Sequence, residues 1–189
     1  MPDYRRDNSM GATWFFTVVT YQRRAFLCKD KVRFELKNAI RKTQAQYAFD
    51  IRAWVLLPDH IHFIWTLPES DSNFQLRIRL IKRYVTQACS GFLHREHLNT
   101  ASRRKRKEST IWQRRYWEHR IRSRKDFRHH MDYIHYNPVK HGLTRMPVHW
   151  PYSTIHCLVR DGVYTENWAS DPDEKQSLNH EYGEQRLGG

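Results

Sequence analysis

The 189-residue sequence has few cysteines, glycines and prolines, and no long apolar run. Its three cysteines, Cys28, Cys89 and Cys157, are odd in number and far apart, which excludes a disulfide framework and a CxxC metal knuckle and indicates reduced thiols. Seven glycines and seven prolines are too few for a collagenous or mainly disordered chain. No segment is long enough to cross a bilayer and no signal peptide follows the basic start, so we expect a cytoplasmic protein without a membrane partner.

Acidic residues are outnumbered by basic ones, 20 against 33, and the charge is unevenly placed. The segment from Ala101 to Lys125 contains eleven basic residues and only two acidic ones, Glu108 and Glu118. Residues 166–189 contain six acidic and two basic residues. This pattern favours a polyanionic partner, usually nucleic acid, over a basic protein without one. We expect a basic N-terminal arm over residues 1–10, one domain over 11–165, and a flexible acidic tail over 166–189.

Apolar periodicity predicts an α+β fold. Strands are expected over residues 14–20, 49–57, 60–67 and 111–121, and helices over 30–47, 74–90 and 126–137, with a weaker element near 154–160. Pro138 is expected to end the third helix, and Arg103–Lys107 is expected to be a solvated loop. The order strand, helix, strand, strand, helix, strand, helix predicts a ferredoxin-like split βαβ arrangement, with a mostly antiparallel sheet, helices on one face and one added helix.

His60-Ile61-His62 is the first group of residues with possible chemistry. Side chains two positions apart in a strand point to the same face, so both imidazoles project together, as two ligands of one metal require. Ile61 then points to the opposite face and contributes to the core. Two surface histidines on an exposed sheet face are the alternative interpretation, and it is the better one for an isolated HxH.

A second group lies in the segment Tyr133-Ile-His-Tyr-Asn137. On a helix, Tyr133 and Asn137 share one face, so a phenol oxygen lies beside an amide oxygen that a hard cation accepts as a ligand. Tyr136 is the rival nucleophile, but its partner four residues on is Lys140 rather than a ligand. Both tyrosines could instead pack the helix against the sheet.

These blocks resemble the single-tyrosine HUH transposases, and most closely the REP-associated tyrosine transposases. The similarity lies in Leu57-Pro58-Asp59-His60-Ile61-His62, then Trp112-Gln113 and Glu118-His119, then Tyr133-Ile134-His135-Tyr136-Asn137-Pro138-Val139-Lys140-His141-Gly142-Leu143. It extends from about Tyr4 to Tyr152. The resemblance places His60 and His62 on the metal ligands, Tyr133 on the nucleophile, and Asn137 where many relatives carry a glutamine ligand.

The resemblance implies a metal-dependent endonuclease and strand transferase for single-stranded, hairpin-forming DNA of the REP type, and a nucleoid-associated location. Mg²⁺ or Mn²⁺ would be the cofactor, and the added helix would carry Tyr133, which forms a 5′-phosphotyrosine. A DNA-hairpin-binding protein without catalysis is the main alternative, and a hydrolytic zinc enzyme built on the two histidines is a third. Either a monomer or a homodimer is compatible with the resemblance.

DNA contacts are expected from cations that neutralise phosphates and from aromatic residues that stack on bases. The candidates are Tyr4, Arg5, Arg6, Lys82, Arg83, Arg103, Arg104, Lys105, Arg106, Lys107, Trp112, Arg114, Arg115 and Lys140, with Tyr116 and Trp117 as further stacking residues. His130 and Lys140 are the open candidates for a base that activates the tyrosine. The acidic tail could compete with DNA for the basic segment.

Overall fold

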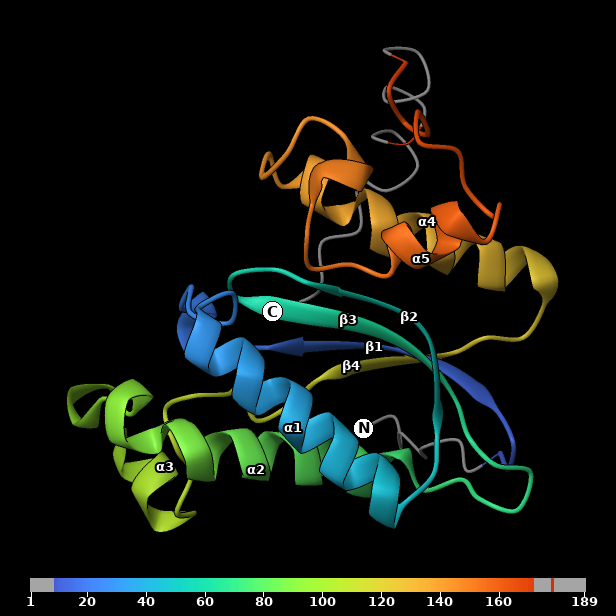
Figure 1. The fold of residues 1–189 in the computed structure, drawn as a ribbon. Coiled ribbons are helices and arrows are strands. Elements are labelled where there is room, and N and C mark those ends of the chain that lie inside the picture. Colours follow the sequence, from blue (N-terminus) through green and yellow to red (C-terminus); the bar gives the residue numbers. More distant parts are fainter. Residues whose placement is uncertain (1–8, 172–177, 179–189) are drawn as a thin grey trace, which may run out of the picture.

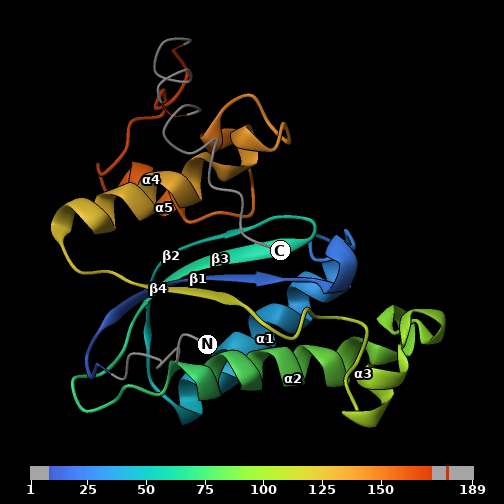
Figure 2. The same ribbon diagram turned by 180° about the vertical axis from the view of Figure 1, so that it is seen from behind.

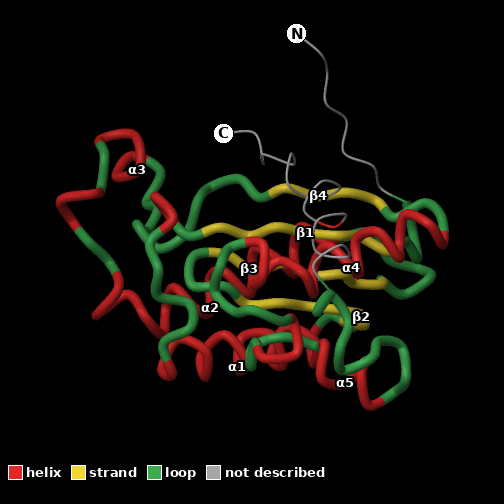
Figure 3. Tube along the Cα trace, turned by 90° about the horizontal axis from the view of Figure 1, so that it is seen from above, coloured by secondary structure: helices red, strands yellow, loops and turns green. Residues whose placement is uncertain are grey.

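The computed structural model describes residues 9–171 and residue 178 as an α+β fold built on a four-stranded sheet. The strands are β1 (Thr13–Val19), β2 (Asp50–Leu56), β3 (His60–Thr66) and β4 (Trp117–Arg120), in the order β2-β3-β1-β4 with all neighbours antiparallel. The predicted hairpin of β2 and β3 is confirmed. The predicted split βαβ arrangement is confirmed too, because β3 lies between β1 and β2 and β1 lies between β3 and β4 (Figure 3).

Helices cover both faces of this sheet (Figures 1 and 2). The long helices α1 (Asp30–Gln46) and α2 (Phe74–Leu93) lie on one face, and α4 (Arg124–Lys140) lies on the other with the short α5 (Ile155–Arg160). Turns of 3₁₀ helix occupy Tyr21–Arg23, Glu96–Leu98 and Pro147–His149. None of the helices in the described part of the chain combines the length and the apolar character that a membrane crossing requires.

Alternation along the central strands separates two apolar clusters. Trp14 and Phe16 of β1, with Ile61 and Phe63 of β3, face α1 and α2, whereas Phe15 belongs to the cluster beneath α4. Both central strands are therefore buried on both faces, and their sequences are almost continuously apolar. In β3 the residues that interrupt this pattern are His60 and His62, and the fold buries both of them under α4.

Three sequence expectations for local structure were wrong. The expected strand over 111–121 is reduced to Trp117–Arg120, with a single bridge between Thr20 and Trp112 before it. The expected loop at Arg103–Lys107 is mostly the short helix α3 (Ala101–Lys105), capped by Thr100, whose side chain accepts a hydrogen bond from the Arg103 N–H. The third helix begins at Arg124 rather than Asp126, because Ser123 caps it through a hydrogen bond from the Asp126 N–H.

The third expectation also concerned the end of α4, which continues through Pro138 to Lys140. Proline removes one helical hydrogen bond, but only the last turn follows it here. A Schellman motif closes that turn: Leu143 N–H donates to the Pro138 carbonyl at 2.9 Å and Gly142 N–H donates to the Val139 carbonyl at 2.9 Å. Gly142 has φ +67°, as this motif requires, and it decides where the helix ends.

The expected tail boundary falls within folded structure. Ala169 is fully buried in the cluster beneath α4, and Trp168 and Leu178 pack against that cluster. The basic arm, with Tyr4, Arg5 and Arg6, and most of the acidic tail lie outside the described residues.

His135 ties α4 to the neighbouring elements, and its burial makes stability depend on pH. Its Nδ1–H donates to the Met131 carbonyl at 2.7 Å, and Nε2 lies 3.0 Å from Thr154 Oγ1, which also hydrogen-bonds Trp54 of β2. Burial lowers the pKa of His135 to about 4, although the Met131 hydrogen bond opposes the shift. As pH falls, His135 is therefore protonated in the unfolded chain at a higher pH than in the folded protein. Folding stability that is present above pH ~6.5 is lost as pH falls toward ~4.

We predict that His135→Gln flattens the pH dependence of folding. The wild type loses folding stability between pH 7.5 and pH 5, and His135 accounts for about 2 kcal/mol of this loss. The value follows from a slope of ~1.4 kcal/mol per pH unit below ~6.5. Urea unfolding at both pH values measures this difference. The dependence is reduced rather than abolished, since the pKa values of His62, His130 and His141 are also lowered. A variant with the full wild-type slope would contradict the assignment.

Candidate active site

The two histidines of β3 lie side by side beneath α4. His60 and His62 are 2% and 0% exposed, and their ring centroids are 4.8 Å apart. Each Nδ1 makes a hydrogen bond to a neighbouring residue. The Asp59 carboxylate accepts from His60 Nδ1 at 2.6 Å, and Thr17 Oγ1 on the adjacent strand β1 hydrogen-bonds His62 Nδ1 at 2.9 Å. With Nδ1 engaged, each imidazole has Nε2 left for a further ligand. The predicted common face of the two side chains is confirmed.

Charge at this site is set by burial and by neighbouring cations. The pKa of His62 lies well below its usual value because of burial, with further lowering by the positive charges of His60, His141 and Lys140, so its imidazole is neutral. Asp59 is half-buried, which raises its pKa, but hydrogen bonds and charge from His60 and Arg23 outweigh this effect and bring the pKa to about 2. Arg23 Nη1 donates to the same carboxylate at 3.0 Å.

Helix α4 brings Tyr133 and Asn137 to these histidines. The Tyr133 ring meets the His62 ring edge-on, with centroids 5.2 Å apart, and Lys140 Nζ lies 5.2 Å from the centroid of the tyrosine ring. Asn137 is 0% exposed, and its amide influences the pKa of both His62 and Tyr133. Tyr136 is also buried and packs in the apolar cluster beneath α4.

The Tyr133 phenol is protonated at neutral pH in this environment. Burial raises its pKa, and the effects of Asn137 and Arg23 offset this only in part. A reaction at this oxygen therefore requires a cation or a base. His130, one of the two candidate bases, directs Nδ1 to Asp126, whereas Lys140 lies over the tyrosine ring.

Among the described residues, three buried polar atoms at the site have no well-formed hydrogen bond: His62 Nε2 and both amide atoms of Asn137, Oδ1 and Nδ2, although the Asn137 amide lies close enough to His62 and Tyr133 to change their pKa values. Leaving a buried polar group unsatisfied costs about 1–3 kcal/mol, so such atoms seldom gather without a ligand. Two imidazoles and an amide oxygen, with positions left open for substrate oxygens, fit Mg²⁺ or Mn²⁺. The residues present therefore fit the expected cofactor.

His141 is a site residue that the sequence analysis missed. Its ring centroid lies 5.2 Å from that of His60, and the residue caps the end of α4. The spacing Tyr133, Asn137, His141 places all three on one helical face, but this signal was hidden by the expectation that Pro138 ends the helix. Thr17 and Arg23 were missed for a different reason: their contacts to His62 and Asp59 join segments far apart in the sequence.

The structure gives three of the expected DNA-binding residues internal roles. Lys82 Nζ donates to the Gln113 carbonyl at 2.7 Å, and burial lowers its pKa to about 8. Arg103 is 7% exposed, stacks over the Tyr21 ring at 4.0 Å and donates to the carbonyls of Ser109 and Trp112. Trp112 is 5% exposed, and its Nε1–H donates to the Lys82 carbonyl at 3.2 Å. These contacts hold the three side chains within the fold, although each also lines the cleft described below.

Comparison with known proteins identifies the family. Residues 12–137 match the family described as "Transposase IS200 like". The chain is 44% identical over 171 residues to the REP-associated tyrosine transposase of Escherichia coli (strain K12), which covers 90% of this chain and 93% of the relative. The chain belongs to the REP-associated tyrosine transposases.

Two further relatives agree with this assignment. A putative REP-associated tyrosine transposase of Haemophilus influenzae (strain ATCC 51907 / DSM 11121 / KW20 / Rd) is 42% identical over 179 residues, covering 93% of this chain and 97% of the relative. A solved structure of a REP-associated tyrosine transposase bound to a REP hairpin has a TM-score of 0.76 and 45% identity, and the match covers 90% of this chain and 93% of that one. The fold expected from the resemblance is therefore confirmed.

Four of the other expected DNA-binding cations of this REP-associated transposase line a basic cleft of about 600 Å³ between α2, α3 and residues 106–114. Arg83, Arg106, Lys107 and Arg114 are exposed along it. Arg104, Lys105 and Arg115 are exposed as well. Glu108 lies among these cations and pairs with Arg103, Arg106 and Arg114. Lys140 is separate, because it lies at the tyrosine.

We predict that exposed and internal cations of the basic cleft affect DNA binding differently. Arg83→Gln combined with Lys107→Gln removes two exposed charges, so the slope of log affinity against log salt for single-stranded DNA should fall in magnitude by about 1.4. Lys82→Met should leave this slope unchanged and lower stability by about 1 kcal/mol, because the Gln113 carbonyl loses its donor. Fluorescence anisotropy at several salt concentrations measures the slope. Equal slopes for both variants would contradict the distinction between exposed cations that bind DNA and internal cations that do not.

Proposed function

We propose that this protein is a metal-dependent endonuclease and strand transferase that acts on single-stranded, hairpin-forming DNA through a 5′-phosphotyrosine at Tyr133. One observation carries the proposal: the Tyr133 ring meets His62 at 5.2 Å between ring centroids, beside three buried polar atoms on His62 and Asn137 that lack a well-formed hydrogen bond among the described residues. A binding protein has no evident need for unsatisfied polar atoms next to a buried phenol. The same arrangement suits transfer of a phosphoryl group to tyrosine.

The proposed ligands of Mg²⁺ or Mn²⁺ are His60, His62 and Asn137. The bound cation would neutralise charge on the scissile phosphate and on the leaving oxygen. Asp59 and Thr17 keep the imidazoles oriented through their Nδ1 atoms, and Asp59 supplies a negative charge behind His60. The second cluster of possible donors, His119, Asp126 and His130, lies away from the imidazole pair and is engaged in its own hydrogen bonds.

Tyr133 supplies the nucleophile. Its phenol oxygen forms a bond to phosphorus while the bond from phosphorus to the 3′-oxygen breaks, and the phenol proton passes to solvent as the leaving oxygen gains one. The product is a 5′-phosphotyrosine and a free 3′-hydroxyl. A second 3′-hydroxyl can then attack the phosphotyrosine, which rejoins a strand without another energy source. The positive charge of Lys140 near the ring favours the phenolate.

The substrate class follows from the relatives and from the surface. The similar solved transposase is bound to a REP hairpin, and we propose REP-type palindromes for this chain too. The basic cleft adjoins the end of the sheet that carries the histidines: Trp112, which lines the cleft, bridges Thr20, and Thr20 N–H donates to the Asp59 carbonyl at 2.9 Å. A strand held in the cleft is thus led toward the site. Helix α4 completes the site within one chain, so a monomer suffices.

We predict that Tyr133→Phe abolishes the covalent protein–DNA adduct, whereas Tyr136→Phe retains it. Phenylalanine keeps the packing of either ring and removes only the oxygen. The assay is incubation with labelled single-stranded hairpin DNA and Mg²⁺ or Mn²⁺, followed by a denaturing gel. The wild type should show a metal-dependent adduct that disappears with a chelator.

Other outcomes of this assay would identify the rival functions. Hairpin binding without an adduct in the wild type would support a DNA-hairpin-binding protein. Cleavage that persists in Tyr133→Phe with zinc would support a hydrolytic zinc enzyme. An adduct in Tyr133→Phe that vanishes in Tyr136→Phe would move the nucleophile to the neighbouring turn of α4.

We predict that Thr17→Val weakens metal binding by about 10- to 100-fold, the usual effect of losing a residue that orients a metal ligand. Valine has nearly the same shape but cannot hydrogen-bond His62 Nδ1. Thr13→Val is the matched control, because Thr13 lies on the same strand and hydrogen-bonds Thr66 at 3.0 Å, far from the histidines. Electron paramagnetic resonance of free Mn²⁺ measures both affinities, and equal affinities would contradict the role of Thr17.

A further inference from the structure

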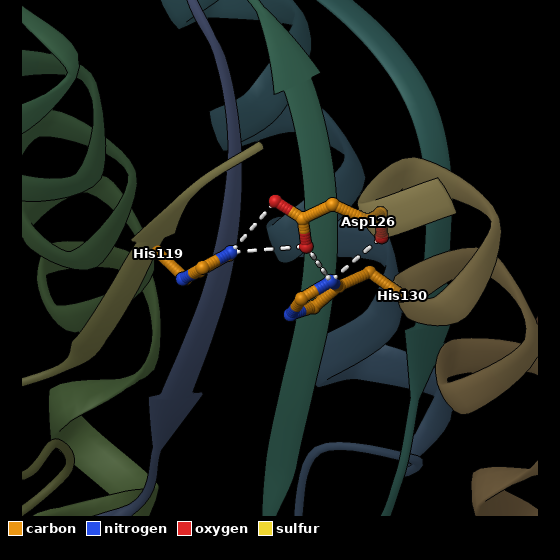
Figure 4. Close-up of side chains that lie close together, drawn as sticks. All are labelled: His119, Asp126 and His130. Carbon is orange, nitrogen blue, oxygen red and sulfur yellow. Dashed lines mark hydrogen bonds and ion pairs between the residues drawn. The ribbon is translucent and has the colours of Figure 1, made fainter. Parts of the chain in front are cut away.

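A second cluster of ionisable side chains joins strand β4 to the first turns of helix α4. His119 Nε2 lies 3.1 and 3.0 Å from the two carboxylate oxygens of Asp126, and His130 Nδ1 lies 3.0 Å from one of them (Figure 4). The rings of His119 and His130 are stacked, with centroids 4.6 Å apart and planes 14° apart. His130 is a candidate base for Tyr133, but its Nδ1 is directed to Asp126, and the chemistry proposed above uses none of these three residues.

Asp126 is the centre of this cluster. Its carboxylate accepts from the Arg122 N–H at 2.9 Å, its own N–H donates to the capping Ser123, and its carbonyl accepts from His130 Nδ1 at 2.9 Å. A carboxylate in the first turn is also favoured by the helix dipole. One residue therefore links the strand, the connection and the beginning of α4.

The charges of the cluster fit a hydrogen-bonded network. Burial alone would raise the pKa of Asp126, but the Arg122 N–H and the hydrogen bond and charge of His119 hold it below the usual value, so the carboxylate is ionised. Burial lowers the pKa of His130, and its neutral ring uses Nδ1–H as a donor to the Asp126 carbonyl. Because that nitrogen carries hydrogen, it lacks the lone pair that a metal would need.

A comparison with the site at His62 separates the two clusters. There, buried polar atoms lack partners, as expected where a ligand is to bind. Among the described residues, the side chains of His119, Asp126 and His130 contribute no buried atom without a partner. The same two-histidine, one-carboxylate set suits zinc or iron in other proteins, so metal binding is the competing outcome for the test.

The cluster is linked to Tyr133 by one aromatic ring. His130 precedes Tyr133 by one helical turn, and Phe15 of β1 contacts both, at 4.8 and 5.8 Å between ring centroids. The Phe15 ring also stacks against His62 at 5.4 Å. A shift of the first turns of α4 would therefore disturb the same packing that sets the tyrosine against the metal-site histidine.

We infer that His119, Asp126 and His130 form a positioning clamp, which fixes the start of α4 on β4 and so sets the distance between Tyr133 and His62. The inference rests on the proposed function of Tyr133. β4 is an edge strand of four residues that pairs only with β1 in the described structure, so its hold on α4 depends on side chains rather than on the sheet. The clamp residues are positioning residues, because their described hydrogen bonds are to one another and to the beginning of α4.

The test uses two substitutions of His119 in the full chain. Glutamine places an N–H donor near the position of His119 Nε2, whereas alanine removes the donor. We expect His119→Ala to slow single-turnover adduct formation by about 10- to 100-fold, as for a small misplacement of a nucleophile, with hairpin DNA affinity changed less than about twofold. His119→Gln should stay within about threefold of the wild-type rate. His156→Ala, an exposed histidine on α5, is the control for histidine removal.

Hydrogen exchange gives a readout that does not depend on activity. His119→Ala should speed amide exchange in the first turns of α4, residues 124–133, and His119→Gln should not. Should His119→Ala fail to fold, Asp126→Asn replaces it, because asparagine keeps an oxygen for the Arg122 N–H but loses the ionised carboxylate. Wild-type exchange and wild-type rate in the alanine variant, or in its replacement, would overturn the clamp.

The remaining outcomes are distinguishable. Two results together would show a metal site instead of the clamp. The first is an equal loss of activity in His119→Gln and His119→Ala. The second is stoichiometric Co²⁺ binding to a His60→Ala/His62→Ala protein, abolished when Asp126→Asn is added. Absence of an adduct in the wild type would reject the proposed function and leave the exchange result to decide whether His119 holds α4. Faster exchange in His119→Ala without a change in adduct rate would show that the clamp is structural only.

Discussion

The structure depends on one constraint: β3 must bury two imidazoles on one face while its other face completes an apolar core. Alternation sends Ile61 and Phe63 toward α1 and α2 and sends His60 and His62 toward α4. An exposed sheet face would leave both rings in water, where they would bind metal weakly and titrate freely. Covering the face with α4 keeps the His62 imidazole neutral, but it also leaves buried polar atoms on His62 and Asn137 that a bound group would satisfy.

Helix α4 therefore has to reach over the whole sheet without ending early. The Schellman motif at Gly142 allows it to pass Pro138, so Tyr133, Asn137 and His141 remain on one face, one turn apart. Ser123 fixes the opposite end, and the hydrogen bonds around Asp126 connect that end to β4. Both ends of the helix are thus determined, which is what the proposed nucleophile in its middle requires if its distance to His62 is to be constant.

Much of this was predictable from the sequence, because the decisive signals are local. Period-two alternation located His60 and His62 on one face, and the order of strands and helices gave the split βαβ arrangement. Contacts between distant segments were not predictable: nothing near Lys82 in the sequence indicates that the Gln113 carbonyl will accept its hydrogen bond, or that Tyr21 will lie beneath Arg103. Pro138 is a misleading local signal, because proline usually ends a helix, whereas Gly142 four residues later provides the Schellman motif that ends this one. Charge composition indicated a polyanion, but burial decides which cations remain free to bind it.

The electrostatics of the proposed site also explain why a buried tyrosine need not react without its substrate. Burial raises the pKa of the Tyr133 phenol, so the free protein holds it in the unreactive, protonated form. The cations nearest to it, Arg23 and Lys140, are partly committed, since Arg23 pairs with Asp59 and burial lowers the pKa of Lys140. In the proposed reaction, a bound metal would supply the positive charge that lowers the phenol pKa, and the phosphate would bind at the coordination positions that the protein leaves open. In such a design the nucleophile becomes competent only when cation and DNA are both present, which restricts cutting to correctly bound strands.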